Sequence, residues 1–453
     1  MKIKKIKFTD HGIFGNLELD FMNPKTKKAF NTIIIAGENG VGKTKLLEII
    51  EAQNFRGESP LTSIDKKYGG SCEIWTEKFK NVAYDFTQRP FFFSFQFNWS
   101  GFSQYSISHS DSTNNITHIN PYKGLIDIFL LLYKQTATIA RTMVKKYPNM
   151  LGKEISERTD APINNIITSY NLFFNDENLS MSGLVNNALE FKKGNKSFNI
   201  RQLSDGEKTI VLFGGTIIPF RKILSLFPIL FDEPDRFLHS KWQKKLLAYL
   251  RKILYDKSDI NKSQFFITTH SEYIISDALK KDDILVVGFN RNENNKLKPY
   301  YYSKDIHKKR SYYILDRPSY YEIIYQVYGE LSYAFFDELY SLLEEKFNTD
   351  KQEELSNIFN KYFPFKGEKN DKILNQKNGR KYFPYYLKSK IKKSCSRSIL
   401  VYFRNQIHHP NNFDIKKGNG QIINQSIADD NELRELFKMA IEILNKNISE
   451  NVS

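Results

Sequence analysis

Residues 33–44 read Ile33-Ile34-Ile35-Ala36-Gly37-Glu38-Asn39-Gly40-Val41-Gly42-Lys43-Thr44. The β-branched beginning predicts a buried strand, and the apolar spacing of residues 45–50 predicts an amphipathic helix. Glycines between a strand and a helix let consecutive backbone N–H groups turn toward one anion, and the helix start adds the positive end of its dipole. The spacing is that of a phosphate-binding loop, or P-loop. We therefore expect ATP and Mg²⁺ to bind here, through Gly37, Asn39, Gly40, Gly42, Lys43 and Thr44.

Composition limits the kind of protein. At 453 residues the chain has room for two or three domains, and 40% hydrophobic residues can build real cores. A net charge of +16 favours a polyanionic partner such as nucleic acid, although a generally lysine-rich surface would give the same total. The two cysteines, Cys72 and Cys395, have no metal-ligand spacing. The longest apolar run, 126–133, is too short to span a bilayer, so we expect a soluble, cytoplasmic protein without a membrane partner.

Strand and helix patterns alternate around the P-loop. Residues 3–21 predict a strand hairpin, and helical spacing from Leu125 to Met143 predicts a helical insertion over about 121–190. The whole pattern predicts an α/β P-loop NTPase domain over residues 1–305, followed by a separate helical domain over residues 306–453. Further apolar runs that predict strands stand at 91–97, 228–232, 264–268 and 284–288.

Polar residues suited to phosphate chemistry follow three of these predicted strands. Asp232 is placed to hold Mg²⁺ together with Thr44, and Glu233 is placed to act as a general base toward water. His270 follows the run 264–268, and Gln96 near the end of 91–97 is a further candidate for contacting Mg²⁺ and the attacking water. Each has an ordinary alternative, because strand ends often carry solvated polar groups and a loop histidine is often structural.

The run Leu203-Ser204-Asp205-Gly206-Glu207 predicts a helix start, with Ser204 as N-cap and Glu207 three residues later. In order with the P-loop, Asp232-Glu233 and Thr269-His270, it resembles the signature motif of ABC-type ATPases. Residues 1–305 resemble most closely the soluble members of prokaryotic defence and DNA maintenance, which include the OLD-type and anticodon-nuclease ATPases. This resemblance implies that Ser204 and Gly206 contact the γ-phosphate bound by a second chain, in a head-to-tail homodimer or higher homo-oligomer. Asp205 departs from the glycine or serine usual in the signature.

Near the C-terminus, the run Arg404-Asn405-Gln406-Ile407-His408-His409 resembles the ribonuclease motif of HEPN domains, which are all-α bundles. The resemblance implies that Arg404 and His409 are catalytic. An arginine can stabilise charge on phosphoryl oxygens, and a histidine can move the proton of the RNA 2′-OH without a metal ion. His408 is expected to point elsewhere. The short motif alone is also compatible with structural roles for both residues.

The segment 372–413 contains no acidic residue and interleaves lysine and arginine with tyrosine and phenylalanine. This composition suits single-stranded RNA, with tRNA as one candidate target, and it is equally typical of a solvated lysine-rich loop. The extra catalytic carboxylate of the anticodon nucleases has no evident counterpart in the sequence.

Three functions therefore compete. The first is an ATPase-controlled ribonuclease toxin of an antiphage, abortive-infection defence system. The second is an ATP-gated sensor or scaffold that binds and releases a separate effector nuclease. The third is a DNA-maintenance ATPase that binds duplex DNA on its basic surface.

Overall fold

A computed structural model gives the three-dimensional structure of the chain. It describes residues 2–52, 61–64, 68–76, 91–97, 103–108, 161–175, 177–185, 188–224, 228–254, 264–292, 294–303, 314–315, 319–362, 399–408, 414–416, 422–424 and 430–445. The chain divides into two compact units, residues 1–312 and residues 313–453. None of the described helices has the length and apolar character needed to cross a membrane.

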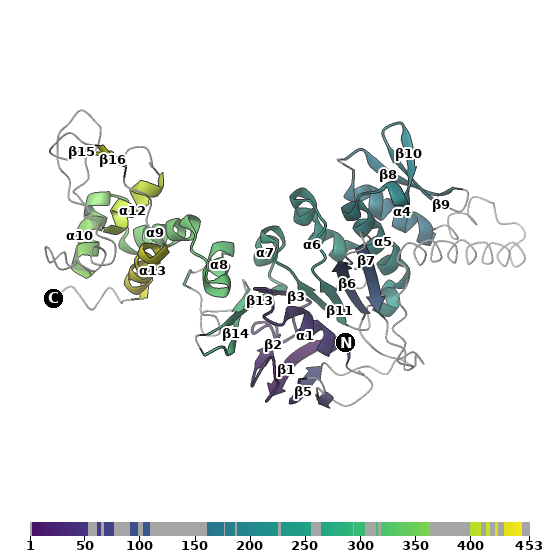
Figure 1. Ribbon diagram of the computed structural model, residues 1–453, viewed down its shortest axis with the longest axis horizontal. Helices are drawn as coiled ribbons and strands as arrows, with labels where there is room; N and C mark the ends of the chain where they lie inside the picture. Colours follow the sequence, from purple (N-terminus) through teal and green to yellow (C-terminus); the bar gives the residue numbers. More distant parts are fainter. Residues whose placement is uncertain are drawn as a thin grey trace, which may run out of the picture. The chain divides into compact units, whose positions relative to one another are not determined.

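The first unit is built on a seven-stranded sheet of order β14-β13-β3-β12-β11-β6-β7 (Figure 1). The five inner strands are parallel, and the edge strands β14 and β7 are antiparallel to their neighbours. Because parallel strands end at the same edge of a sheet, the loops that follow β3, β11 and β12 meet there. The strands are, in sheet order, Leu297–Tyr302, Ile284–Arg291, Thr32–Gly37, Gln264–Thr268, Pro228–Asp232, Phe91–Phe97 and Ser103–Ser108.

Helix α1 (Lys43–Glu51) and a second, antiparallel sheet cover one face of this central sheet, and α6 (Ser240–Leu254) and α7 (Glu272–Leu279) lie on the other (Figure 1). The second sheet has the order β2-β1-β5-β4. Every residue of β3 and β12 is buried, as expected for parallel strands covered on both faces. The predicted hairpin is confirmed as β1 and β2. The strands of the second sheet are Glu18–Asp20, Ile3–Thr9, Ser71–Thr76 and Leu61–Ile64.

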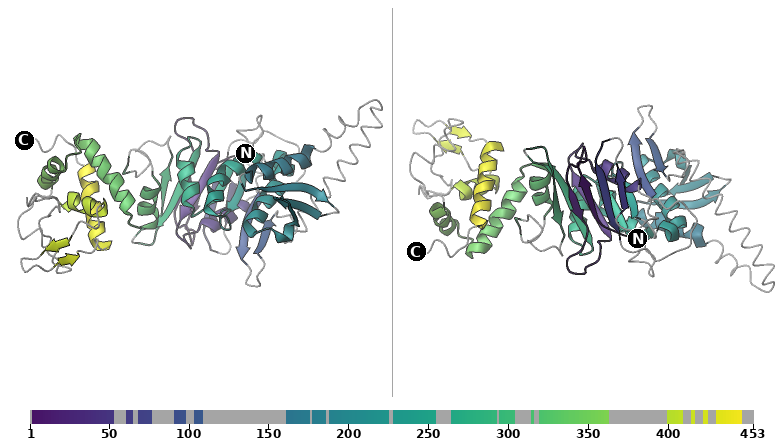
Figure 2. Two further views of the ribbon diagram at one scale, coloured as in Figure 1. Left: turned by 90° about the horizontal axis from the view of Figure 1, so that it is seen from above. Right: turned by 90° about the horizontal axis from the view of Figure 1, so that it is seen from below.

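The expected helical insertion over 121–190 is wrong in its last part. Residues 121–160 lie outside the described residues, and α4 (Ala161–Phe173) is helical as expected. The chain then forms a three-stranded antiparallel sheet of β8 (Leu179–Val185), β9 (Ala188–Lys193) and β10 (Lys196–Asn199). Its buried residues alternate with exposed ones, which is the period of a strand and not of a helix. Strand β8 packs along α4 (Figure 2), and α4 packs against α5 (Asp205–Leu224).

The second unit is mainly helical, with one apolar core. Its helices are α8 (Tyr320–Tyr328), α9 (Tyr333–Phe347), α10 (Gln352–Tyr362), α12 (Ile399–His408) and α13 (Asp430–Asn445). Ser332 caps α9, because its hydroxyl accepts a hydrogen bond from the Phe335 N–H at 3.1 Å. Helices α8, α12 and α13 all pack against α9. Their buried residues include Phe336, Leu339, Phe403 and Phe437.

The second unit differs from the expected all-α domain in one feature. Asp414–Lys416 and Ile422–Asn424 pair as the short antiparallel strands β15 and β16, so the prediction of an entirely α-helical unit is wrong.

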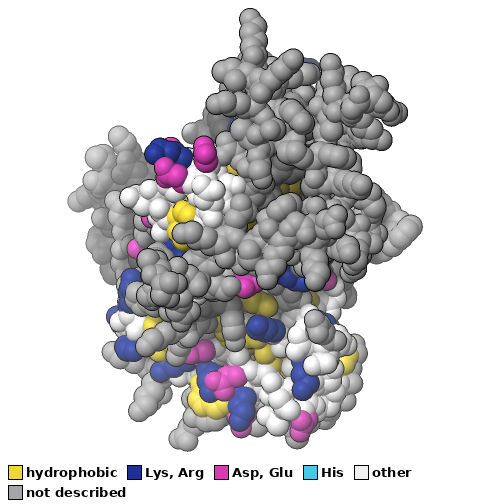
Figure 3. All heavy atoms as spheres, turned by 90° about the vertical axis from the view of Figure 1, so that its left-hand side faces the viewer, with side chains coloured by type: hydrophobic (Ala, Val, Ile, Leu, Met, Phe, Trp, Pro, Cys, Tyr) yellow, Lys and Arg dark blue, Asp and Glu magenta, His cyan; other side chains and the backbone are white. Residues whose placement is uncertain are grey.

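Charged side chains of both signs are mixed on the described surface. On the face of the molecule shown in Figure 3, described lysine and arginine side chains lie interspersed with aspartate and glutamate. The basic segment 372–398 lies outside the described residues.

Candidate functional site

The P-loop joins the end of β3 to the start of α1. Gly37, Gly40 and Gly42 have φ angles of 153°, 78° and 110°, which L-amino acids with side chains rarely adopt. A Cβ on Gly37 would lie 2.7 Å from the Phe289 carbonyl oxygen, so the loop also needs glycine there for space. Residues 38–40, which include Asn39, are exposed. The loop therefore presents backbone to solvent next to the N-terminus of α1, as an anion-binding loop requires.

Lys43 closes this loop with its side chain. Its Nζ donates hydrogen bonds to the carbonyl oxygens of Gly37 at 2.8 Å and Glu38 at 2.9 Å, and the residue is only 6% exposed. Burial lowers the pKa of Lys43, while the carboxylates of Glu233, Asp232 and Glu38 oppose that shift. The lysine thus lies between the P-loop backbone and the carboxylates that follow β11.

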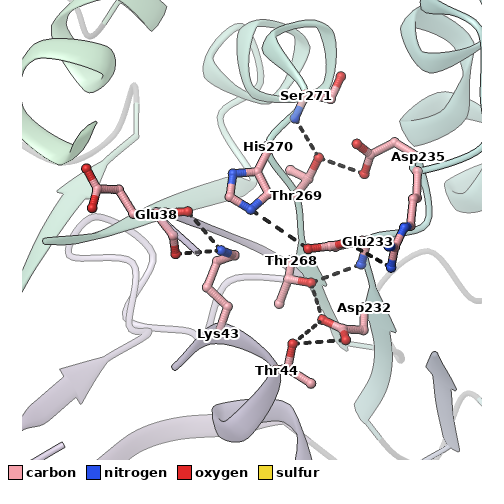
Figure 4. A network of polar contacts seen from close by, with 12 residues as sticks. Glu38, Lys43, Thr44, Asp232, Glu233, Asp235, Thr268, Thr269, His270 and Ser271 are labelled. Carbon is pink, nitrogen blue, oxygen red and sulfur yellow. Dashed lines mark hydrogen bonds and ion pairs between the residues drawn. The ribbon is translucent and has the colours of Figure 1, made fainter. Parts of the chain in front are cut away.

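Asp232, at the end of β11, connects the P-loop to strand β12 (Figure 4). The Thr44 hydroxyl lies 3.1 and 3.0 Å from its two carboxylate oxygens, and the Thr268 hydroxyl donates to Oδ1 at 2.6 Å. Burial raises the pKa of Asp232, and the hydrogen bonds from Thr268 and Thr44 oppose the rise. Sequence reasoning missed Thr268. Thr268 is the last residue of its strand, as Asp232 is of β11, and the two are the last register pair of β11 and β12. Its place at the end of the apolar run 264–268 was the signal in the sequence.

Glu233 has a backbone conformation that is rare for its residue type. Its φ is 47°, and its N–H donates to both the carbonyl and the hydroxyl oxygen of Thr268, at 3.1 and 3.0 Å. The surrounding structure thus holds a strained residue in place, which is common at functional sites. The Glu233 carboxylate lies 3.8 Å from His270 Nε2 and 3.8 Å from an Arg236 nitrogen. Burial, and then the charge of Lys43, lowers the pKa of His270.

The loop of residues 234–239, which we call the D-loop, is anchored by contacts that the sequence did not indicate. Asp235 is 7% exposed and accepts a hydrogen bond from the Thr269 hydroxyl at 2.7 Å. Burial raises the pKa of Asp235 to about 6, although the bond from Thr269 opposes the rise. The Gln243 amide on α6 donates to the carbonyl oxygens of Asp235 at 3.3 Å and Leu238 at 2.9 Å.

The signature segment forms the start of α5, and the predicted capping box is confirmed. The Ser204 N–H donates to Glu207 Oε2 at 2.7 Å, and the Glu207 N–H donates to the Ser204 hydroxyl at 3.3 Å. Ser204 is exposed, whereas Gly206 is buried. A Cβ on Gly206 would lie 2.8 Å from the Phe237 carbonyl oxygen, so glycine is needed for the close packing of α5 on the D-loop.

The structure therefore brings Lys43, Thr44, Asp232, Glu233 and His270 into one network. Gln96 lies on β6, two residues past the register partner of Asp232, and its side chain is outside the described part of the chain. Arg404 lies in the second unit, on α12, with its guanidinium carbon 5.3 Å from the centroid of the Tyr340 ring. His409 lies outside the described residues.

Comparison with known proteins identifies the family of the first unit. Residues 33–276, more than half of the chain, match the family described as "AAA domain, putative AbiEii toxin, Type IV TA system". The chain belongs to this AAA-domain family. The matched span contains the P-loop, the signature segment, Asp232, Glu233 and His270, and so includes the whole network of Figure 4.

Individual relatives are more distant. The chain is similar to Septu protein PtuA of Bacillus mycoides (strain KBAB4), with 23% identity over 285 residues, which make up 59% of this chain and 38% of that protein. The chain thus aligns with well under half of this curated relative. Among solved structures, it is similar to the SMC head domain from Thermotoga maritima, with a TM-score of 0.35, 15% identity, and coverage of 66% of this chain and 99% of that one. A Pyrococcus furiosus Smc head bound to the C-terminal domain of ScpA gives a TM-score of 0.37, 14% identity, and coverage of 66% and 96%.

The residues present fit ATP and Mg²⁺. The Thr44 hydroxyl and the Asp232 carboxylate lie in contact with each other, and oxygen ligands of this kind suit Mg²⁺. Among the described residues, no three His, Cys, Asp or Glu side chains gather as a protein-only metal centre. A magnesium ion at Thr44 and Asp232 would therefore share its coordination with phosphate oxygens of the nucleotide and water, as is usual in nucleotide-binding sites.

Proposed function

We propose that this chain binds and hydrolyses ATP at the network of Lys43, Thr44, Asp232, Glu233 and His270. The observation that carries the proposal is the unbroken set of contacts from the Thr44 hydroxyl through Asp232 and Thr268 to Glu233. Lys43 and the P-loop amides bind the phosphates. Thr44 and Asp232 hold Mg²⁺, which when bound neutralises charge on the β- and γ-phosphates.

Glu233 is the general base of this proposal. It accepts a proton from the attacking water, and the hydrogen bonds from its N–H to the carbonyl and hydroxyl oxygens of Thr268 hold its backbone in place. Burial, and then the charge of Lys43, lowers the pKa of His270, which favours the neutral imidazole beside Glu233.

The test is phosphate release by the full chain and by Glu233→Gln. The variant should bind ATP with unchanged affinity and lose turnover by about 10²- to 10⁴-fold, the usual contribution of a general base. Glu48→Gln, at an exposed glutamate of α1, is the matched control and should turn over normally. Normal turnover in Glu233→Gln would remove the general-base assignment.

We further propose that ATP turnover controls a defence effector. Support comes from the description of the matched family, which names a toxin and a type IV toxin–antitoxin system, and from the similarity to Septu protein PtuA. This proposal has two forms: the effector is the second unit itself, or it is a separate protein.

In the first form, the second unit is an RNA-cleaving toxin with Arg404 and His409 in its active site. The 2′-OH attacks the adjacent phosphorus, the bond from phosphorus to O5′ breaks, and the products are a 2′,3′-cyclic phosphate and a 5′-OH. His409 moves the proton in this scheme, and Arg404 stabilises the phosphoryl charge. The supporting observation is that Arg404 lies one helical turn from His408, whose Nε2 is 3.0 Å from Asp337 Oδ1, so basic groups and a carboxylate gather on α9 and α12.

Contacts around Arg404 favour the second form, a scaffold that binds a separate effector. The guanidinium lies over the Tyr340 ring of α9. Burial raises the pKa of Glu344, and the charge of Arg404 opposes that rise. An arginine already bound by an aromatic ring and near a carboxylate serves to pack α12 on α9, and a phosphate would have to compete with Glu344 for it.

Expression toxicity and RNA cleavage separate the two forms. A wild-type chain that cleaves RNA, with cleavage lost in Arg404→Ala and His409→Ala but retained in His408→Ala, supports the ribonuclease. ATP turnover must stay normal in all variants as evidence of folding. An inert wild type that gains toxicity only with a second protein supports the scaffold, and ATP turnover stimulated by duplex DNA would instead support DNA maintenance.

A further inference from the structure

Three consecutive residues after β12 send their side chains to two different places. His270 faces Glu233, with its Nε2 3.8 Å from the carboxylate (Figure 4). The neighbouring Thr269 and Ser271 side chains face the other way: the Thr269 hydroxyl donates to Asp235 at 2.7 Å, and the Ser271 hydroxyl donates to the Gln243 carbonyl oxygen at 2.8 Å. The segment that carries His270 is therefore attached to other elements on both sides of the histidine.

Gln243 uses both ends of its amide. The oxygen accepts from Ser271, and the nitrogen donates to the Leu238 carbonyl at 2.9 Å and the Asp235 carbonyl at 3.3 Å. One side chain on α6 thus joins the segment beside His270 to the backbone of the D-loop. The Ser271 N–H, which donates to the Thr269 hydroxyl at 2.9 Å, closes the ring of contacts.

The far side of the D-loop touches the signature helix. The Phe237 carbonyl and the Trp242 ring leave no room for a side chain on Gly206, with 2.8 and 3.0 Å to a Cβ built there. A displacement of the D-loop backbone therefore has to displace the start of α5, because a packed contact at this distance cannot absorb it. Ser204, which caps α5, moves with that helix.

We propose that Gln243 is a positioning residue that makes the His270 segment and the D-loop move together, so that the nucleotide state at His270 sets the position of the signature helix. The inference rests on the proposed ATPase activity and adds to it a regulatory connection within one chain. Gln243 touches no reacting group: its partners are Ser271 and two backbone carbonyls.

The Gln243 side chain makes two sets of hydrogen bonds: one with Ser271, which we call the Ser271 arm, and one with the Asp235 and Leu238 carbonyls, which we call the D-loop arm. Substitutions can break them separately. Gln243→Glu keeps an oxygen for the Ser271 hydroxyl and puts a second oxygen against the Asp235 and Leu238 carbonyls, which breaks only the D-loop arm. Ser271→Ala breaks the other arm and also removes the N-cap of α7, because the Ser271 hydroxyl accepts from the Ile274 N–H at 3.4 Å. Ser271→Thr restores both contacts. Lys244→Ala, at the exposed neighbour of Gln243 on α6, is the matched control.

We expect Gln243→Glu and Ser271→Ala each to lower kcat about tenfold with KM changed less than about threefold, because orientation and not ATP binding is lost. Ser271→Thr and Lys244→Ala should behave as the wild type. The double variant Gln243→Glu/Ser271→Ala should be no slower than the slower single variant, because both changes cut the same connection. Additive losses in the double variant, or losses in KM alone, would overturn the inference.

Hydrogen exchange with a non-hydrolysable ATP analogue tests the same connection without turnover, so it distinguishes a failure of this inference from a failure of the proposed hydrolysis. On analogue binding, amides of the 269–275 segment and of the D-loop should gain protection together in the wild type. In Gln243→Glu only the 269–275 segment should respond. If both segments respond as in the wild type, the inference is wrong, whether or not the protein hydrolyses ATP.

Discussion

The hydroxyl of Thr44 lies 3.0 and 3.1 Å from the two carboxylate oxygens of Asp232, although 188 residues separate them in the sequence. Both residues owe their place to the parallel sheet. Thr44 begins the helix after β3, and Asp232 ends β11, with only β12 between the two strands. The Thr268 hydroxyl at the end of β12 donates to the same carboxylate and holds it toward Thr44. The sheet thus brings a hydroxyl and a carboxylate from distant parts of the sequence into contact.

Loss of the Asp232 charge should weaken binding of Mg²⁺-ATP more than binding of ATP alone. We expect Asp232→Asn to remove most of the gain in ATP affinity that Mg²⁺ produces, by about tenfold or more, because a carboxylate in contact with a divalent ion is lost. The measurement is a nucleotide titration with Mg²⁺ and again with EDTA. Asp277→Asn, on α7, is the control and should keep the wild-type difference between the two titrations.

Lys43 should be required for ATP binding itself. Lys43→Met keeps the length and the apolar stem of the side chain but removes the ammonium, so we expect ATP affinity to fall by about 100-fold, as for loss of a buried charge-assisted contact. Lys45→Ala, two residues along α1, changes a lysine that contacts Glu48 and the Tyr68 ring, and should leave affinity within about threefold. An affinity of Lys43→Met equal to that of Lys45→Ala would contradict the role assigned to Lys43.

The buried Asp235 should make the stability of the first unit depend on pH. Its pKa is about 6 in the folded chain against 3.8 for an ordinary aspartate, so between about pH 4 and 6 the folded state binds more protons than the unfolded state. Stability from this group is therefore highest below pH 4, falls as the pH rises to 6, and is constant above. The shift corresponds to about 3 kcal/mol.

Asp235→Asn should abolish this dependence, since the amide keeps an oxygen for the Thr269 hydroxyl and carries no charge. We expect the variant to gain about 3 kcal/mol over the wild type at pH 7 and little at pH 4, measured as the unfolding transition of the first unit. Asp282→Asn, at an exposed position, controls for the chemical change alone. An equal effect of Asp235→Asn at both pH values would contradict the prediction.

Much of the proposed ATP site could be predicted from the sequence because it consists of residues at or just after the ends of buried strands. The strands at Ile33, Phe231 and Ile267 are apolar runs, and parallel pairing brings the residues after them to one edge. Lys43, Asp232 and His270 were expected on that basis, and the structure places them in one network.

What the sequence did not predict depends on contacts between distant side chains and backbone. Gln243 is a polar residue on an amphipathic helix, and nothing in its local pattern indicates that its amide meets two D-loop carbonyls. The prediction of a helix where β8 and β9 lie failed for a different reason. The alternation of buried Leu179, Met181 and Phe191 with exposed neighbours was present in the sequence, but the helical spacing upstream was extended across it.

The final prediction is that two chains share each ATP site, with Ser204 of one chain completing the site of Lys43 in the other. Within one chain, Ser204 forms hydrogen bonds with Glu207: the Ser204 N–H donates to the Glu207 carboxylate, and the Ser204 hydroxyl accepts from the Glu207 N–H. Substitution of Gly206 would be ambiguous, because a Cβ there meets the Phe237 carbonyl at 2.8 Å. Ser204→Asp is cleaner: aspartate is an equally good N-cap, so α5 keeps its start, while a negative charge is placed against the partner's γ-phosphate. We expect this variant to bind ATP and to lose turnover.

Mixed dimers decide between a shared and an unshared site. When Lys43→Ala and Ser204→Asp chains are mixed in equal amounts, about half of the dimers contain one of each, and each such dimer has one intact shared site, so about a quarter of wild-type turnover should return. In the control, wild type is mixed with the Lys43→Ala/Ser204→Asp double variant. Those mixed dimers have no intact shared site, and the wild-type homodimers alone supply about a quarter of wild-type turnover. If each chain instead completes its own site, the first mixture is inactive and the control mixture keeps about half of wild-type turnover. Fluorescence transfer between labelled chains verifies that mixed dimers form, so an inactive first mixture with demonstrated exchange contradicts the shared site.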